Sequence, residues 1–120
     1  MTFANATDCK IIWDLCAFSM RNPDNSWNSD NAERLFAHMQ ENNQNVHGWQ
    51  LGNEPGHWKS RHPQDQISAQ QLGQDICLLH TLVTGQYEGV GSNIYGPDTC
   101  GPAPMTTSSP CSSMDFFNDI

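Results

Sequence analysis

Short runs of hydrophobic residues alternate along the chain with segments of helical periodicity. The first run, residues 11–18, is rich in β-branched and aromatic side chains and predicts a buried strand. Apolar positions at helical spacing follow over residues 30–43, and Asp30 with Glu33 three residues later predicts a capping box at the start of this helix. The chain therefore begins with a strand followed by a helix of about three turns.

The same alternation continues in the second half of the chain. Residues 48–53 predict a second strand, which ends before a proline that cannot donate a ladder hydrogen bond. Ser68 starts a second capping box, and the helix that follows carries a wide apolar stripe up to a stop at Gly85. Residues 93–97 predict a short third strand, and a loop and the start of another helix follow it.

Strands that alternate with helices indicate βαβ units and a parallel sheet, most of it buried on both faces. Three strands are too few to close a barrel, and such a sheet on its own would leave backbone edges and apolar surface exposed. We therefore expect an α/β fold in which residues 1–120 are one partial domain, incomplete at both ends.

Composition and charge exclude several classes of protein. The 120 residues include 13 acidic and 5 basic side chains, a formal charge of −8, which disfavours nucleic acid as a partner. No apolar run approaches the roughly 20 residues of a transmembrane span. The first residues lack the pattern of a signal peptide, so export cannot be read from this N-terminus.

The cysteines do not predict a metal site. They are odd in number, form no CxxC pair and have no histidine at zinc-ligand spacing, although one or two disulfides stay open. The five positions are Cys9, Cys16, Cys77, Cys100 and Cys111.

Candidate chemistry lies in the sequence Leu-Gly-Asn-Glu-Pro at positions 51–55. Asn53 and Glu54 follow a predicted strand directly, and functional sites of parallel α/β proteins lie at the carboxyl ends of strands. Apolar neighbours in the sequence would raise the pKa of Glu54, as a proton donor near neutral pH requires. The alternative is a simple turn with a solvated or helix-capping carboxylate.

The motif stands within a longer resemblance. From Thr2 to about Pro102 the chain resembles the heparanases, endo-β-glucuronidases grouped with the β-glucuronidase glycoside hydrolases. The matching stretches occur in the family's order and at nearly its spacing: Thr2–Asn5, Trp27–Ala32, Leu51–Pro55, Gln71–Asp75 with Leu79-His80, and Tyr95–Asp98.

This resemblance implies a (β/α)8 TIM barrel of about 250 residues in a retaining glycosidase, of which this chain supplies about the third to fifth strands. It implies that Glu54 is the general acid/base and that Asn53 hydrogen-bonds the 2-hydroxyl of the sugar. No cofactor or metal is implied, because two carboxylates suffice for the reaction.

The second carboxylate of a retaining mechanism is not expected in this chain. The resemblance places the nucleophile beyond Ile120, so the segment alone should be inactive. Asp14, Asp75 and Asp98 are present, but we do not expect any of them to replace it.

Two residues just past the motif are candidates for substrate binding. Trp58 can stack on a sugar ring or fill the barrel mouth, and Lys59 can reach a uronate carboxylate or stay a solvated loop charge. Residues 99–105 lack the Gln and the Arg/Lys cluster by which the family grips a sulfated chain. The resemblance therefore implies the reaction type, while these residues do not supply the charged contacts to a sulfated chain.

Asn5-Ala6-Thr7 is a glycosylation sequon, and the matching family position also carries one. Its use would fix a secreted, extracellular-matrix or lysosomal context.

The first hypothesis for function is a retaining endo-glycosidase that cleaves a polysaccharide containing uronic acid, such as heparan sulfate. The alternative is a non-catalytic heparanase relative that binds glycosaminoglycan or protein partners outside the cell. A third alternative is a truncated product that does not fold.

Overall fold

The computed structural model describes residues 2–19, 21–54 and 67–98. Within them three strands and three helices alternate, and a short π-helical turn extends the last helix. The elements are α1 (Thr2–Thr7), β1 (Ile12–Leu15), α2 (Asp30–Glu41), β2 (Gly48–Leu51), α4 (Ala69–Thr81), η3 (Leu82–Gln86) and β3 (Asn93–Tyr95).

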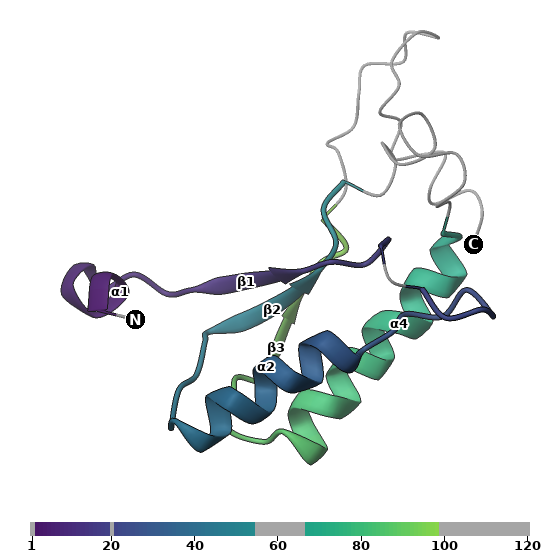
Figure 1. The fold of residues 1–120 in the computed structure, drawn as a ribbon. Helices are drawn as coiled ribbons and strands as arrows, with labels where there is room; N and C mark the ends of the chain where they lie inside the picture. The colour runs from purple at the N-terminus through teal and green to yellow at the C-terminus, as the bar shows by residue number, and fades with distance from the viewer. Residues whose placement is uncertain (1, 20, 55–66, 99–120) are drawn as a thin grey trace, which may run out of the picture.

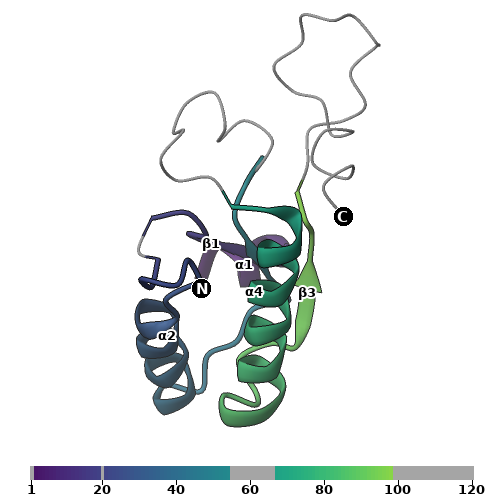
Figure 2. The same cartoon turned by 90° about the vertical axis from the view of Figure 1, so that its right-hand side faces the viewer.

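The three strands form one parallel sheet in the order β1-β2-β3, so β2 is central. Asp14, Gln50 and Tyr95 occupy one row of the register, while Leu15 pairs with Leu51. Both α2 and α4 lie on the same side of the sheet (Figures 1 and 2). The predicted parallel α/β unit is confirmed.

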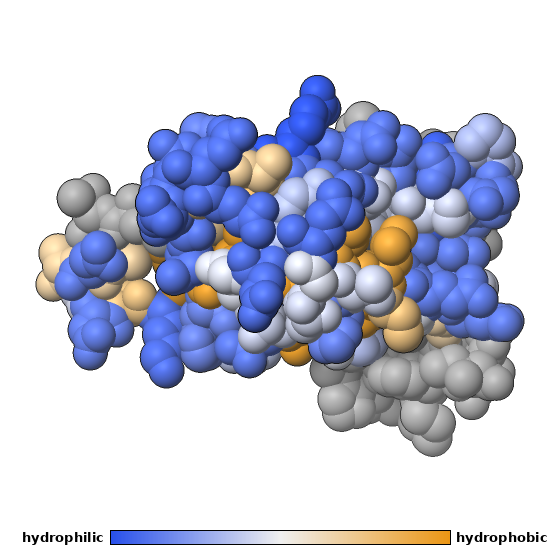
Figure 3. Space-filling view, turned by 90° about the horizontal axis from the view of Figure 1, so that it is seen from below, coloured by the Kyte–Doolittle hydropathy of each residue, from blue (hydrophilic) through white to orange (hydrophobic). Residues whose placement is uncertain are grey.

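The helices bury one face of the sheet. Phe36 and Trp49 are fully buried and meet edge to face, with ring centroids 4.7 Å apart, a geometry worth about 1 kcal/mol beyond the buried area. Tyr87, just past η3, contacts the same Phe36 ring at 5.5 Å. The largest fully buried apolar side chains come from α2, β2, α4, η3 and the segment after it: Phe36, Trp49, Leu51, Leu72, Leu79, Val83 and Val90. Seen from below, the molecule shows mainly hydrophilic residues with apolar ones between them (Figure 3).

The opposite face of the sheet carries no helix among the described residues, and we call it the open face. Side chains alternate along a strand, so Asp14, Gln50 and Tyr95 lie there while their neighbours Leu15 and Leu51 face the helices. Among the described residues helices cover one face of the sheet, and burial of the other face stays a prediction for the whole protein.

The strand β1 is also more exposed than predicted. It covers four of the eight residues expected, and Ile12 and Trp13 are 46% and 45% exposed. The reason is its place at the edge of the sheet, where among the described residues only β2 pairs with it. The apolar run at 11–18 indicated burial that a single neighbouring strand does not provide.

Helix α4 begins as predicted, because the Ser68 hydroxyl oxygen accepts a hydrogen bond from the Gln71 N–H at 3.0 Å. Helix α2 begins differently. Its N-cap is Ser29, not Asp30, and the Ser29 hydroxyl donates to the Glu33 carboxylate at 2.6 Å instead of capping the backbone. The predicted capping box at Asp30 is therefore wrong: the N-cap position is one residue earlier and makes no side-chain hydrogen bond to the backbone.

Helix α1 has no counterpart in the sequence prediction. It is a short helix that lies beyond the amino end of β1, away from α2 and α4 (Figure 1). The predicted loop from residue 55 to about residue 66, the loop at 101–110 and the helix at 112–120 lie outside the described residues.

A buried ion pair joins the segment after β1 to α4. Asp75 is 2% exposed, and its carboxylate accepts hydrogen bonds from Arg21 Nη2 at 2.7 Å and from the Trp27 backbone N–H at 3.0 Å. Gln71 Nε2 donates to it as well, at 2.9 Å. Removing this carboxylate would leave a cation and a backbone donor without their partner.

We therefore expect Asp75→Ala to lower the free energy of unfolding by about 3 kcal/mol, measured by urea denaturation of the protein. Gln74→Ala is the matched control, because Gln74 is exposed one residue earlier on α4 and should change stability by less than about 0.5 kcal/mol. Equal losses from the two substitutions would contradict a stabilising role for the buried pair.

Candidate functional site

The structure brings Asn53 and Glu54 to the carboxyl end of the central strand, directly after β2. Gly52 has a positive φ of 76°, which suits glycine, and Glu54 has a φ of 48°. Asn53 is exposed and Glu54 is partly buried. The chain therefore turns sharply at the strand end and presents an amide and a carboxylate side by side in sequence.

Asp98 pairs with this turn from the neighbouring strand. It follows β3 by three residues and forms a parallel bridge with Asn53, and its backbone carbonyl accepts a hydrogen bond from the Glu54 N–H at 3.0 Å. The two strand ends are thus joined beyond the regular ladder.

A side-chain contact reinforces this junction on the open face. Gln50 Nε2 donates to the Asp98 carboxylate at 3.1 Å and to the Gly52 carbonyl at 3.4 Å. The sequence analysis did not single out Gln50. The sequence feature that could have identified it is a polar residue between the buried apolar residues Trp49 and Leu51. Because alternate residues of a strand face opposite sides of a sheet, this polar residue lies on the face away from the core.

Asp14 lies beside Gln50 in the register, at the end of β1. Solvent reaches its carboxyl, but crowding by the neighbouring strands removes part of its hydration and raises its pKa above the usual range. Hydrogen bonding to the Gly52 backbone opposes this rise, and the negative charge of Asp98 adds to it. Each strand end therefore contributes a polar group near the same turn.

The remaining candidates are dispersed. Trp49 and Leu51, the apolar neighbours of the motif in sequence, lie in the helix-side core. Asp75 is buried in its ion pair on the helix side. Asn5 is exposed on α1. Trp58 and Lys59 lie outside the described residues.

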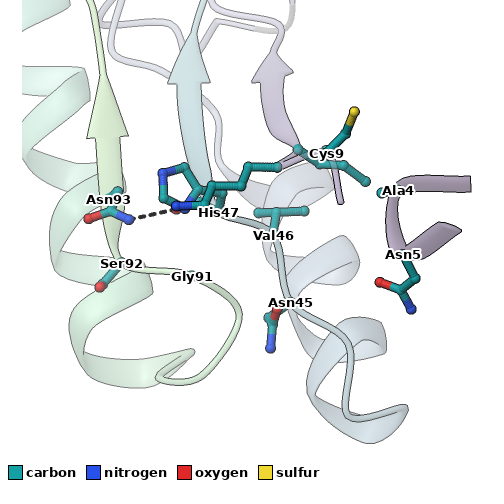
Figure 4. Close-up of a pocket in the computed structure, with 11 residues that line it drawn as sticks. Ala4, Asn5, Cys9, Asn45, Val46, His47, Gly91, Ser92 and Asn93 are labelled. Carbon is teal, nitrogen blue, oxygen red and sulfur yellow. Dashed lines mark hydrogen bonds between the residues drawn. The ribbon is translucent and has the colours of Figure 1, made fainter. Parts of the chain in front are cut away.

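A hollow of about 410 Å³ opens at the other end of the sheet. His47, which precedes β2, and Asn93, the first residue of β3, line it, and the Asn93 amide donates to the His47 carbonyl at 2.7 Å (Figure 4). It surrounds the amino ends of the strands, whereas functional sites of parallel α/β proteins lie at the carboxyl ends. The turn at Glu54 is therefore the better candidate site.

Cysteines and possible metal ligands do not cluster in the part of the chain that the structure describes. The thiols of Cys9, Cys16 and Cys77 are free and exposed there, and no group of three or more His, Cys, Asp or Glu side chains is placed to hold a metal ion. No helix within residues 2–19, 21–54 and 67–98 is long and apolar enough to cross a membrane.

Comparison with known proteins gives the family context of this site. The sequence profile of the N-terminal domain of glycosyl hydrolase family 79 matches residues 1–104. Rat heparanase is 36% identical over 106 residues, which cover 88% of this chain and 19% of that protein. Bovine heparanase is 33% identical over 101 residues, 84% of this chain and 18% of the relative.

Mouse inactive heparanase-2 is 34% identical over 100 residues, 83% of this chain and 16% of that protein. The chain thus spans less than a fifth of the length of these relatives. The profile covers most of the chain and includes Asn53, Glu54 and Asp98. The chain therefore belongs to glycosyl hydrolase family 79 and is heparanase-like.

Proposed function

We propose that this chain supplies the acid/base half of the active site of a retaining, heparanase-type glycoside hydrolase. The observation that carries the proposal is the position of Glu54, a partly buried residue that follows the central strand of a parallel sheet. Its N–H is bonded to the adjacent strand end, so the turn has a defined place. The family match supports glycosidic bonds as the target.

In the proposed reaction Glu54 first donates a proton to the departing glycosidic oxygen, and it later takes a proton from the water that releases the sugar. Asn53 hydrogen-bonds the 2-hydroxyl of the sugar, a contact that strengthens as positive charge develops on the ring. The nucleophilic carboxylate comes from a strand later in the protein, about 5–5.5 Å from Glu54.

The proposed scaffold is a (β/α)8 barrel, to which residues 1–120 contribute a partial domain. Three sequential parallel strands with their helices on one face support it, because that face would be the outside of the barrel. The polar side chains of the open face, Asp14 and Gln50, would then point into the barrel interior.

The proposed substrate is a polysaccharide that contains uronic acid, such as heparan sulfate, because heparanases are among the relatives. Trp58 and Lys59 follow Glu54 closely in the sequence and are our candidates for stacking on a sugar ring and for binding a uronate carboxylate. A glycosaminoglycan partner fits a secreted, extracellular-matrix or lysosomal protein, which is the location we propose.

A second candidate function has an observation in its favour. Inactive heparanase-2 matches this chain about as well as the heparanases do, at 34% against 33–36% identity. The second candidate is therefore a non-catalytic function, in which the protein binds glycosaminoglycan or a protein partner without cleaving it. The catalytic function requires a nucleophilic carboxylate from a later strand of the protein, whereas the binding function does not.

Glu54→Gln in the full-length protein should lower the cleavage rate by about 100-fold or more, because the amide cannot donate or accept the catalytic proton. Binding of the polysaccharide should change little, since the amide has nearly the same shape. Cleavage is measured by the release of reducing ends and binding by calorimetry. Glu88→Gln, an exposed glutamate near the amino end of β3, is the control, and full activity of Glu54→Gln would refute the proposal.

Translation of the transcript on both sides of this segment separates the two candidate functions. We expect a Glu at the carboxyl end of a later strand beyond Ile120, because retaining hydrolysis needs a second carboxylate. A continuous barrel in which another residue replaces that Glu would instead support the binding function.

Asn5 should carry an N-glycan when the full-length protein is expressed through the secretory route, because its sequon is on the exposed surface of α1. Mass spectrometry of tryptic peptides before and after enzymatic deglycosylation measures this. Asn5→Gln should remove the mass shift, and an unmodified Asn5 in secreted protein would contradict the expectation.

A further inference from the structure

Asp98 is linked to the turn that carries Glu54 in two ways, directly by its backbone and through Gln50 by its carboxylate. The backbone carbonyl accepts from the Glu54 N–H at 3.0 Å, and the carboxylate accepts from Gln50 Nε2 at 3.1 Å. Gln50 also donates to the Gly52 carbonyl at 3.4 Å, so its amide connects Asp98 to the first residue of the turn. Asp98 thus holds the turn at both its start and its end.

The backbone of Glu54 gives a reason for such a restraint. A non-glycine residue with a φ of 48° lies in the left-handed region, which is rarely populated and costs roughly 1–3 kcal/mol unless its surroundings enforce it. Glycine would adopt this conformation freely, so the conformation alone does not call for a glutamate. The contacts of Asp98 are the kind of restraint that keeps a glutamate in this geometry.

We propose that Asp98 is a positioning residue for Glu54: its carboxylate holds the Gln50 amide, and together they fix the turn from Gly52 to Glu54 against the end of β3. This inference rests on the proposed function, in which Glu54 transfers protons. Asp98 does not touch the reacting atoms in this scheme and acts only through the turn.

The consequence is a specific kinetic defect. A carboxylic acid displaced by about 1 Å from the glycosidic oxygen loses on the order of 100-fold in rate. The loss depends on how much the leaving group needs a proton: a nitrophenolate departs largely without one, whereas a plain phenolate is more basic and depends on the acid. General destabilisation would lower both rates by the same factor.

The test uses the full-length protein and two substrates, phenyl β-D-glucuronide and 4-nitrophenyl β-D-glucuronide. The measured quantity is kcat/KM, which reports the step in which the leaving group departs, because hydrolysis of the glycosyl-enzyme is the same for both substrates. We expect Asp98→Ala to lower kcat/KM for the phenyl glycoside by roughly 10-fold to 100-fold and for the nitrophenyl glycoside by less than about 3-fold. Asp98→Asn should keep most of the activity, because its amide oxygen still accepts from Gln50. Gln50→Ala should match Asp98→Ala, and the double variant should be no worse than either single variant.

Asn93→Ala is the matched control. It removes a side-chain hydrogen bond of similar length from the opposite end of the same strand, where the Asn93 amide donates to the His47 carbonyl at 2.7 Å. We expect equal and small effects of this change on both substrates. A selective loss on the phenyl glycoside in Asn93→Ala would show that any perturbation of β3 produces the defect, which would overturn the inference.

Hydrogen exchange supplies a readout that does not depend on turnover. The Glu54 amide should exchange faster in Asp98→Ala and Gln50→Ala than in the wild type, measured by mass spectrometry of peptides that contain residues 50–54. Unchanged exchange, or equal losses of kcat/KM on the two glucuronides, would overturn the inference. If the wild type cleaves the polysaccharide but neither glucuronide, exchange alone decides whether Asp98 orders the turn. A wild type that cleaves neither the glucuronides nor the polysaccharide would refute the proposed function instead, and exchange would again decide the role of Asp98.

Discussion

The architecture depends on the position of β2 between two parallel neighbours. Its alternating side chains send Trp49 and Leu51 into the helix-side core and Gln50 to the open face. A shift of one residue in the register would reverse every one of these directions, so burial of the large apolar side chains enforces the register. The same register determines where the strand ends and hence where Asn53 and Glu54 lie.

Close packing on the open face adds a second constraint. The Tyr95 ring lies directly over Gly48, so closely that a Cβ atom at that position would collide with it. Gly48 is therefore required by its neighbour on β3, while Gly52 is required by its own backbone conformation. Gly48 is the first residue of β2, and Gly52 is the residue that directly follows it.

Polar groups are distributed according to what surrounds them. On the helix side Asp75 is buried and receives three hydrogen-bond donors, including the guanidinium of Arg21, as a carboxylate removed from water requires. On the open face Asp14 and Asp98 remain accessible to solvent, and their charges influence each other. The structural carboxylate and those near the proposed catalytic turn are thus separated by the sheet.

The sequence by itself determined the order of strands and helices, the parallel sheet, the cap at Ser68 and the position of Asn53 and Glu54 after the second strand, because these follow from local periodicity and turn chemistry. It did not reveal that β1 pairs only with β2 among the described residues, that α2 begins after Ser29 without a side-chain cap, or that Asp98 and Gln50 meet beside the turn. Gln50 and Asp98 are 48 residues apart, and only the pairing of β2 with β3 brings them together. Contacts of this kind depend on register and on which neighbours a strand has, and tertiary structure alone decides both.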